Sequence, residues 1–235
     1  MAAKTRQAAE NPEKAVAKGK AGEAVRARPK RVPRNPQRTH SAILDAATEE
    51  FAAHGFGGAR VDAIAARAKT NKRMLYHYFG DKEGLYVAVL EASYATIRSA
   101  EKSLDLARRD PEDGMRELAL FTWNHFLKHP EFLSLLVTEN LHEARYLQRS
   151  DKISVMHSHF IGELASVLRR GEAVGIFRAA IDPVSVYLTI AALGFFYLSN
   201  RHTLSTIFSR ELTAPAALAA WGEHIVSVTL ASIKR

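Results

Sequence analysis

Apolar side chains recur every three or four residues along almost the whole chain after Arg38, and this spacing constrains the fold more than any other feature. The interval matches one face of an α-helix, which completes a turn in about 3.6 residues. A half-buried β-strand would instead alternate apolar and polar residues, and no segment does so over a sustained length. The sequence therefore predicts an all-α fold.

Length and composition allow a globular protein with a buried core. The chain has 235 residues, 47% of them hydrophobic, and its lack of cysteine excludes disulfides and thiolate zinc sites. The longest uninterrupted apolar run, Tyr187–Leu198, is shorter than the roughly 20 residues that a membrane-spanning helix needs. We therefore expect a cytoplasmic protein without a membrane partner.

The net charge of +8 lies entirely in the first 38 residues. They carry 11 of the 33 Lys/Arg residues and 3 of the 25 Asp/Glu residues. The rest of the chain therefore has 22 basic and 22 acidic residues and no net charge. The segment also has four prolines and few large apolar residues, so we predict a disordered basic tail over residues 1–37. Such a tail is either an arm held near phosphates or a solubilising extension without a role of its own.

Three short predicted helices follow the tail. The first runs from Arg38 to His54, the second begins near Val61, and Asn71 is placed to cap the third before Gly80 ends it. Two short helices joined by a brief turn, behind a supporting helix, are typical of a helix-turn-helix. The second helix of such a pair inserts side chains into the DNA major groove.

Longer helices are predicted for the remainder. Asp110-Pro111 and Asp182-Pro183 each combine a capping residue with proline at the first helical position. The predicted helices span residues 111–129, 130–142, 151–172, 183–208 and 215–233.

The stretch "HGFGGARVDAIAARAKTNKRMLYHYFGDKEGLY" resembles the DNA-binding region of the TetR family of bacterial transcriptional regulators. The likeness covers Arg38 to Val89, is most specific from Leu75 to Leu85, and extends to the subgroup that controls nitrogen-compound or aromatic catabolism. Four residues depart from the family pattern, and two of them, Gly80 and Asp81, replace a common Pro or Lys and a Ser, where Asp81 caps equally well. Arg60 replaces the Ser or Thr that caps the second helix, and Lys69 replaces a turn glycine, which requires a positive φ or a modified turn.

The resemblance implies a helix-turn-helix DNA-binding head over residues 38–84 and a larger helical ligand-binding and dimerisation domain over residues 85–235. It further implies a homodimer on the bacterial nucleoid, which binds a palindromic double-stranded DNA operator. A small-molecule effector would release it, in most cases as a repressor. The residues expected to contact DNA are Arg60, Lys69, Thr70, Asn71, Lys72, Arg73, Met74, Tyr76, His77 and Lys82.

Two further sets of residues are assigned to the larger domain. Polar groups on apolar faces and aromatic rings suggest an effector pocket, with the ordinary core as the alternative. Its candidate residues are Trp123, Phe126, Glu139, Asn140, His157, Phe160, Phe196 and Asn200. The dimer interface, again with an intrachain core as the alternative, is expected to contain Val186, Ile190, Leu193, Tyr197, Leu218, Trp221, Ile225 and Val228.

Three other functions compete with this interpretation. A weakly specific architectural DNA binder would use the basic tail and need the larger domain only for dimerisation. An enzyme is disfavoured because no nucleophile–base motif or phosphate loop is recognisable. Histidines at 125 and 129 could share a metal on one helix face, but ten scattered histidines do not form a convincing ligand set, so we expect no metal and no cofactor.

Overall fold

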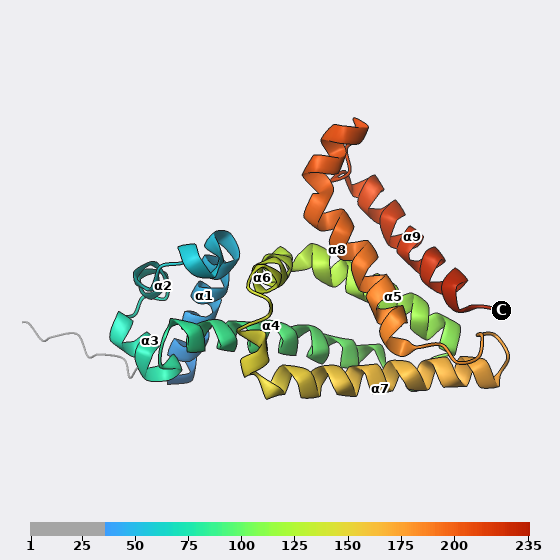
Figure 1. Ribbon diagram of the computed structural model, residues 1–235, viewed down its shortest axis with the longest axis horizontal. Helices are drawn as coiled ribbons and strands as arrows, with labels where there is room; N and C mark the ends of the chain where they lie inside the picture. Colours follow the sequence, from blue (N-terminus) through green and yellow to red (C-terminus); the bar gives the residue numbers. More distant parts are fainter. Residues whose placement is uncertain (1–35) are drawn as a thin grey trace, which may run out of the picture. The chain divides into compact units, whose positions relative to one another are not determined.

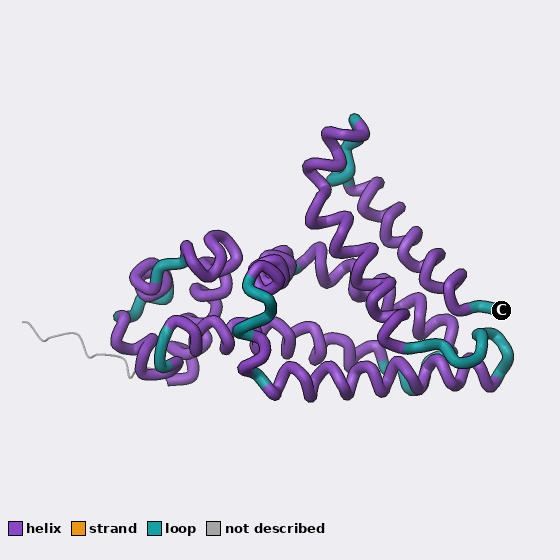
Figure 2. Tube along the Cα trace, viewed as in Figure 1, coloured by secondary structure: helices purple, strands orange, loops and turns teal. Residues whose placement is uncertain are grey.

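The computed structural model describes residues 36–235, and helices account for most of them (Figure 2). The all-α prediction is confirmed, since the described chain has nine α-helices and its β-pairing is limited to one isolated bridge, between Phe177 and Lys234. The predicted tail lies outside the described residues except for Pro36 and Gln37, which already belong to the first helix. The helices are α1 (Pro36–Gly58), α2 (Val61–Arg67), α3 (Lys72–Phe79), α4 (Lys82–Glu101), the 3-10 helix η1 (Lys102–Leu104), α5 (Pro111–Lys128), α6 (Pro130–Leu141), the 3-10 helix η2 (Leu147–Arg149), α7 (Asp151–Ala173), α8 (Pro183–Phe208) and α9 (Pro215–Ile233).

Side-chain caps set the starts of α5 and α8, as the sequence predicts. The Asp110 carboxylate accepts hydrogen bonds from the backbone N–H groups of Glu112 and Asp113. Asp182 does the same for the first turn of α8. The first N–H groups of a helix have no partner within it, so these carboxylates satisfy them, and proline at the next position has no N–H to satisfy.

Helices α1, α2 and α3 pack with the first turns of α4 into a small head (Figure 1). Its core contains the fully buried side chains of Phe51, Leu75 and Tyr86. Gly55 interrupts α1 with φ 63° and ψ 178°, so the regular helix ends where the sequence predicts it. A residue with a side chain adopts this backbone conformation only with strain, which explains the glycine.

In the larger part of the molecule, α5 packs against α7, α8 and α9 (Figure 1). Two glycines allow the close approach of their helices to α5. A Cβ atom on Gly222 of α9 would lie 2.9 Å from Cδ1 of Trp123, and one on Gly194 of α8 would lie 3.1 Å from Cδ2 of Phe126. Both aromatic residues are therefore part of the packing between helices.

Helices α8 and α9 have more apolar surface than the chain itself covers. Each meets the length and mean hydropathy of a membrane-spanning helix, although neither contains an uninterrupted apolar run of about 20 residues. A core helix of a soluble protein meets the same criteria, but it is mostly buried. Only 28% and 33% of the apolar windows of α8 and α9 are buried within the chain, so much of their apolar surface is exposed.

Candidate DNA-binding head and effector cavity

Caps at both ends of α3 fix its orientation. The Asn71 side chain accepts a hydrogen bond from the Met74 backbone N at 3.0 Å, and Gly80 follows the helix with φ 78°. Leu75 faces the core and is 1% exposed. The predicted DNA-contacting side chains that are exposed on α3 are Lys72, Arg73, Tyr76 and His77.

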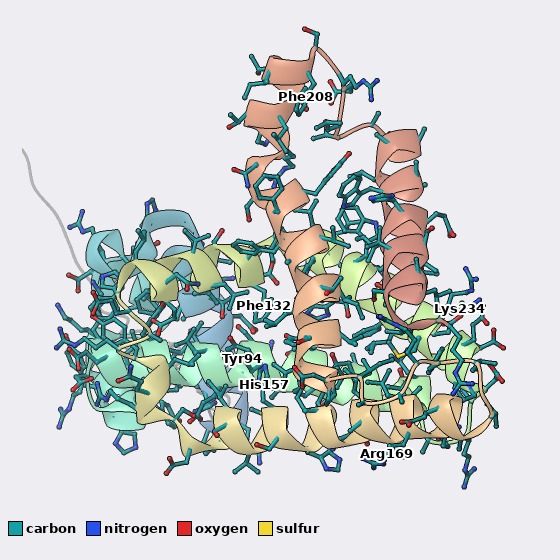
Figure 3. All side chains as sticks on the ribbon, turned by 45° about the vertical axis from the view of Figure 1, so that its right-hand side comes forward. Tyr94, Phe132, His157, Arg169, Phe208 and Lys234 are labelled. Carbon is teal, nitrogen blue, oxygen red and sulfur yellow. The ribbon has the colours of Figure 1, made fainter. Side chains whose placement is uncertain are left out.

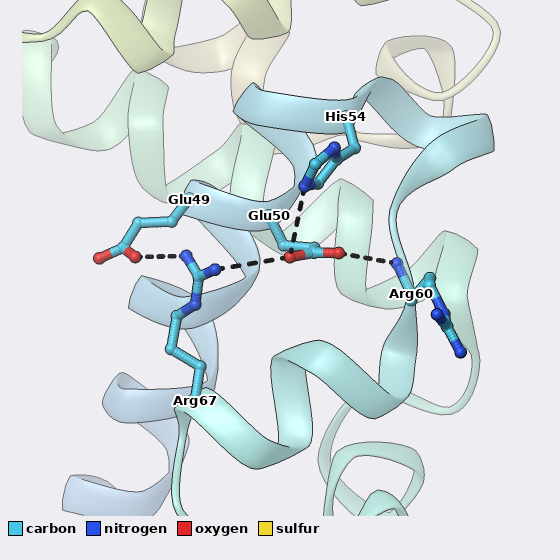
Figure 4. A network of polar contacts seen from close by, with 5 residues as sticks. All are labelled: Glu49, Glu50, His54, Arg60 and Arg67. Carbon is cyan, nitrogen blue, oxygen red and sulfur yellow. Dashed lines mark hydrogen bonds and ion pairs between the residues drawn. The ribbon is translucent and has the colours of Figure 1, made fainter.

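Glu50 of α1 holds α2 in place (Figure 4). Its buried carboxylate accepts a hydrogen bond from the Arg60 backbone N at 3.1 Å and lies 3.7 Å from Nη2 of Arg67. Arg60 makes no side-chain cap, and Glu50, ten positions earlier, instead accepts a hydrogen bond from the backbone N–H of Arg60 itself, just before α2. Arg67 also pairs with Glu49, which joins the other end of α2 to α1. Sequence analysis missed Glu50 because it lies among the apolar residues of α1.

The turn between α2 and α3 has the unusual backbone that the sequence indicates. Lys69 has φ 50°, which confirms that its position requires a positive φ, and its side chain is exposed. Thr70 was expected to contact a phosphate. Its hydroxyl oxygen is instead buried, without a hydrogen-bond partner among the described residues, so it does not reach the surface as it stands.

Other predicted contacts are partly engaged within the head. Nζ of Lys72 lies 3.3 Å from Asp62 of α2. Nζ of Lys82 lies 4.8 Å from the centre of the Phe56 ring, and burial lowers the pKa of this lysine while Glu50 opposes that shift. Arg60, Asn71 and Arg73 are exposed, whereas Met74 is half-buried. The exposed face therefore centres on Arg73, Tyr76 and His77.

Tyr78, next to the predicted DNA-contacting Tyr76 and His77, supports the head. Its hydroxyl donates a hydrogen bond to the Pro36 carbonyl at 3.3 Å, and its ring contacts His40 edge-on. Phe79 packs on the same histidine. The start of α1 is thereby fixed to the end of α3.

A buried ion pair lies between α4, α7 and α8. Arg98 of α4 is 6% exposed, and its guanidinium carbon is 4.2 Å from the centre of the Phe160 ring and 5.6 Å from that of Tyr187. Glu101 is 3% exposed, and its Oε2 lies 2.9 Å from Nη1 of Arg98. Neither charge was among the predicted site residues, because charged residues on a helix are usually solvated.

More aromatic rings extend this cluster along α4 (Figure 3). The Tyr94 ring lies 5.1 Å from His157 of α7 and 5.2 Å from Phe132 of α6, centre to centre. Burial raises the pKa of Tyr94 to about 12. It also lowers the pKa of His157, with a further contribution from Arg98, so this histidine is neutral near pH 7.

Two cavities border the aromatic cluster, and a groove lies next to one of them. One of about 200 Å³ lies beside the ion pair and is lined by Arg98, Glu101, Met156, Phe160 and neighbouring residues. A second, of about 370 Å³, adjoins Tyr94 and His157. A wider and more open groove of about 1010 Å³ shares Val155 and Met156 with the first cavity.

The predicted effector residues do not form one group. His157 and Phe160 lie in the cluster around Arg98. Trp123 and Phe126 belong to the packing of α5 against α8 and α9, where Nε1 of Trp123 donates to the Leu218 carbonyl. Glu139 is buried and accepts from the Leu147 backbone N, below the head. The remaining three are Asn140 and Phe196, which are exposed, and Asn200, which is half-buried.

The predicted dimer residues are mostly covered by their own chain. Those buried within it are Val186, Ile190, Tyr197 and Ile225, and those half-buried are Leu193, Leu218, Trp221 and Val228. The first four thus occupy the intrachain core that the sequence left as the alternative. A different set of large apolar side chains on α8 is exposed, namely Val184, Leu188, Phe196, Ile207 and Phe208.

His125 and His129, and likewise His157 and His159 two positions apart on α7, show no metal-binding arrangement in the described part of the chain. His125 and His129 lie 4.4 Å apart, centre to centre, but no group of three potential ligands capable of holding a metal occurs among residues 36–235. Burial, with a contribution from His129, lowers the pKa of His125 to about 4. His157 faces Tyr94, whereas His159 pairs with Glu163.

Both parts of the chain match known families. Residues 43–89 match the model described as "Bacterial regulatory proteins, tetR family", and residues 111–229 match "Tetracyclin repressor-like, C-terminal domain". The chain belongs to the TetR family. It is therefore a helix-turn-helix transcriptional regulator that binds DNA, and the resemblance inferred from the sequence is confirmed.

Individual relatives support the same family. The HTH-type transcriptional repressor NicS of Pseudomonas putida is 41% identical over 198 residues, which cover 84% of this chain and 93% of NicS. An HTH-type transcriptional repressor of Streptomyces coelicolor is 35% identical over 67% of this chain and 78% of its own length. The crystal structure of a transcriptional regulator from the same organism has a TM-score of 0.63 and 27% identity, and the match covers 83% of this chain and 98% of that one.

Proposed function

We propose that this TetR-family regulator is a homodimeric repressor that binds a palindromic operator on the nucleoid and is released by a small molecule. The outer face of α3 carries the proposal. Arg73, Tyr76 and His77 are exposed there on a helix that is capped at both ends, so their direction is fixed. The relatives that are named repressors support the sign of regulation.

Each exposed residue has a role that follows from its chemistry. Arg73 donates to O6 and N7 of a guanine, because its planar guanidinium matches both acceptors. Lys69 and Tyr76 hold phosphates and set the register of the head on the duplex. Lys72 reaches DNA after leaving Asp62, an exposed pair that dissociates at little cost. Lys82 must likewise leave the Phe56 ring.

Dimerisation uses the exposed apolar face of α8 together with α9. Leu188 and Phe196 are eight residues apart on α8, close to two helical turns, so they lie along one side. Burying this side against a second copy removes apolar area from water. Two heads in one dimer read half-sites about 34–36 Å apart, which requires a palindromic operator. The larger domain, residues 85–235, supplies this contact, and the head comprises residues 38–84.

A footprint on the DNA upstream of the regulator's own gene tests the proposal, with affinity measured by fluorescence anisotropy. Protection of a palindrome is expected. Arg73→Ala should weaken binding to this site by about 1–3 kcal/mol and reduce discrimination at one base pair. Arg169→Ala, a change at an exposed arginine of α7, is the matched control and should leave affinity unchanged. Uniform protection with a steep salt dependence would instead indicate an architectural DNA binder.

A further inference from the structure

The positive charge of the N-terminal tail is concentrated next to the DNA-binding head. Residues 26–35, "RARPKRVPRN", contain five Lys/Arg and no Asp/Glu, whereas the longer segment 1–25 contains five Lys/Arg and three Asp/Glu. We call residues 26–35 the arm. Charge improves solubility wherever it lies in a tail, so a solubilising extension gives no reason for this gradient. An arm that contacts a polyanion close to the head does give one.

The start of α1 joins the arm to the recognition helix. Pro36, the first residue of α1, follows the arm directly, and its carbonyl accepts the hydrogen bond from the Tyr78 hydroxyl of α3 at 3.3 Å. One turn later, the His40 ring lies 5.6 Å from the Tyr78 ring and 4.8 Å from that of Phe79, centre to centre. The chain therefore enters the head at the end of α3, the helix whose outer face is assigned to the major groove.

The described part of the chain adds little net charge of its own. Residues 1–35 hold 10 of the 33 Lys/Arg and 3 of the 25 Asp/Glu, which leaves 23 basic and 22 acidic residues for 36–235. Two of the lysines expected to contact DNA are also engaged, Lys72 with Asp62 and Lys82 with the Phe56 ring. The five cations of the arm are thus a major source of attraction to a duplex.

We propose that the arm binds in the minor groove of the operator, next to the major groove that α3 reads. This inference rests on the proposed function, because it adds a second DNA contact to that regulator. The minor groove is about 6 Å wide and admits a single strand of chain. Where it is narrow, at A·T-rich sequences, its negative potential attracts inserted arginines. Pro29 and Pro33 favour a single strand, since proline cannot continue a helix or the ladder of a sheet.

The length of the arm limits which groove it reaches. Ten residues span at most about 33–36 Å, and one turn of the duplex occupies about 34–36 Å. The minor groove beside the α3 site is about half a turn away, so the arm reaches it and has residues left to follow it. We therefore expect each half-site of the operator to carry an adjacent A·T-rich segment that no residue of α3 contacts.

Two full-length variants that lose the same charge test the position of the contact. The arm variant changes four residues to alanine, Arg26, Arg28, Lys30 and Arg31. The distal variant changes Lys4, Arg6, Lys14 and Lys18 in the same way. Both sets precede α1, and equal Tm values check that the fold is unaffected. Affinity for the operator is measured by fluorescence anisotropy at several salt concentrations.

The two variants should differ clearly. At about 100 mM salt we expect the arm variant to bind the operator roughly tenfold or more weakly than the parent, and the distal variant within about threefold of it. The slope of log affinity against log salt should fall by about 2–4 in the arm variant, because each phosphate charge neutralised contributes about 0.9.

Modified operators identify the groove. An inosine–cytosine pair presents the minor-groove edge of A·T and the major-groove edge of G·C. Replacing the adjacent A·T pairs by G·C should therefore weaken binding of the parent, whereas replacing them by inosine–cytosine should not. The arm variant should respond to neither change. Hydroxyl-radical cleavage should show protection of this segment by the parent and the distal variant only.

Several results would overturn the proposal. These are equal losses of affinity in the two variants, an arm variant with the affinity and salt slope of the parent, and equal effects of G·C and inosine–cytosine pairs on the parent. All three leave protection of the palindrome by α3 in place, so the proposed function would stand. A parent protein that protects no palindrome contradicts the proposed function, and the inference with it, without recourse to a variant.

Discussion

Replacing Glu50 by alanine should loosen the helix-turn-helix without removing a DNA-facing side chain. Glu50 is 4% exposed and joins the Arg60 backbone N and the Arg67 guanidinium to α1. A hydrogen bond to a charged group contributes about 1.5–3 kcal/mol. The Arg67 side chain is exposed, so water replaces part of its contact, and we expect a total loss of about 1–2 kcal/mol. In a chain of this size that lowers Tm by about 2–8 °C.

The assay is thermal unfolding followed by circular dichroism, at one protein concentration because subunit association affects Tm. Glu50→Gln retains an acceptor for the Arg60 N–H but not the charge that faces Arg67, so its Tm should lie between those of the parent and Glu50→Ala. Glu49→Ala is the control. The Glu49 side chain is 65% exposed and pairs with Arg67 at the surface, so we expect a change below about 0.5 kcal/mol.

The result that would refute this reasoning is an equal Tm for Glu50→Ala and Glu49→Ala. The buried carboxylate would then contribute no more than an exposed one, and the start of α2 would need another explanation. Operator affinity gives an independent reading, because a loosened α2 no longer supports α3 in the groove. We expect Glu50→Ala to bind the operator more weakly than Glu49→Ala does.

Three further predictions concern other parts of the fold. Gly222→Ala places a Cβ 2.9 Å from Trp123 and should lower the unfolding free energy, measured by urea titration, by about 1–3 kcal/mol. Gly57→Ala is the control, because its new Cβ meets nothing within 4 Å, and it should change the unfolding free energy little. Burial raises the pKa of Glu101 from 4.5 to about 7, so the folded protein binds a proton at this residue more tightly than the unfolded chain does. The resulting contribution to the free energy of unfolding is present at low pH and is lost as the pH rises through 7. The urea midpoint of Glu101→Gln should therefore rise relative to the parent between about pH 6 and pH 8, and a constant difference would contradict the shift. Leu188→Glu puts a charge on the exposed face of α8 and should give a monomer by light scattering, and a dimer of unchanged stability would exclude this face from the interface.

The parts of the fold that follow from neighbouring residues could be predicted from the sequence. The starts of α5 and α8 depend on Asp-Pro pairs, in which cap and helix are adjacent. The positive φ at Lys69 follows from the geometry of a short turn. The recognition helix was placed for the same reason, because Asn71 and Gly80 define its ends within one short segment.

Features that depend on distant residues could not be predicted in this way. Arg98 meets Tyr187, 89 positions later, and a charged residue on a helix gives no sign that the fold will bury it. The face of α8 was assigned to the dimer on the basis of a stripe through Val186 and Ile190, which the chain itself buries. Apolar residues occur on every side of this helix, so periodicity alone does not show which side meets α5 and which is left for a partner.

One helix connects the cavity beside Arg98 to the DNA-binding surface. α4 begins directly after the cap at Asp81 and continues without a break to Glu101, so Arg98 lies about 24 Å along it from Lys82. The head has a second attachment, where Phe56 of α1 packs 4.4 Å from the Tyr146 ring, centre to centre, beyond the end of α6. A ligand that moves α4 relative to this attachment must rotate the head rather than shift it as a whole. In the proposed dimer, we expect rotation in both subunits to change the separation of the two α3 helices, so that a palindrome with a fixed half-site spacing no longer fits both heads.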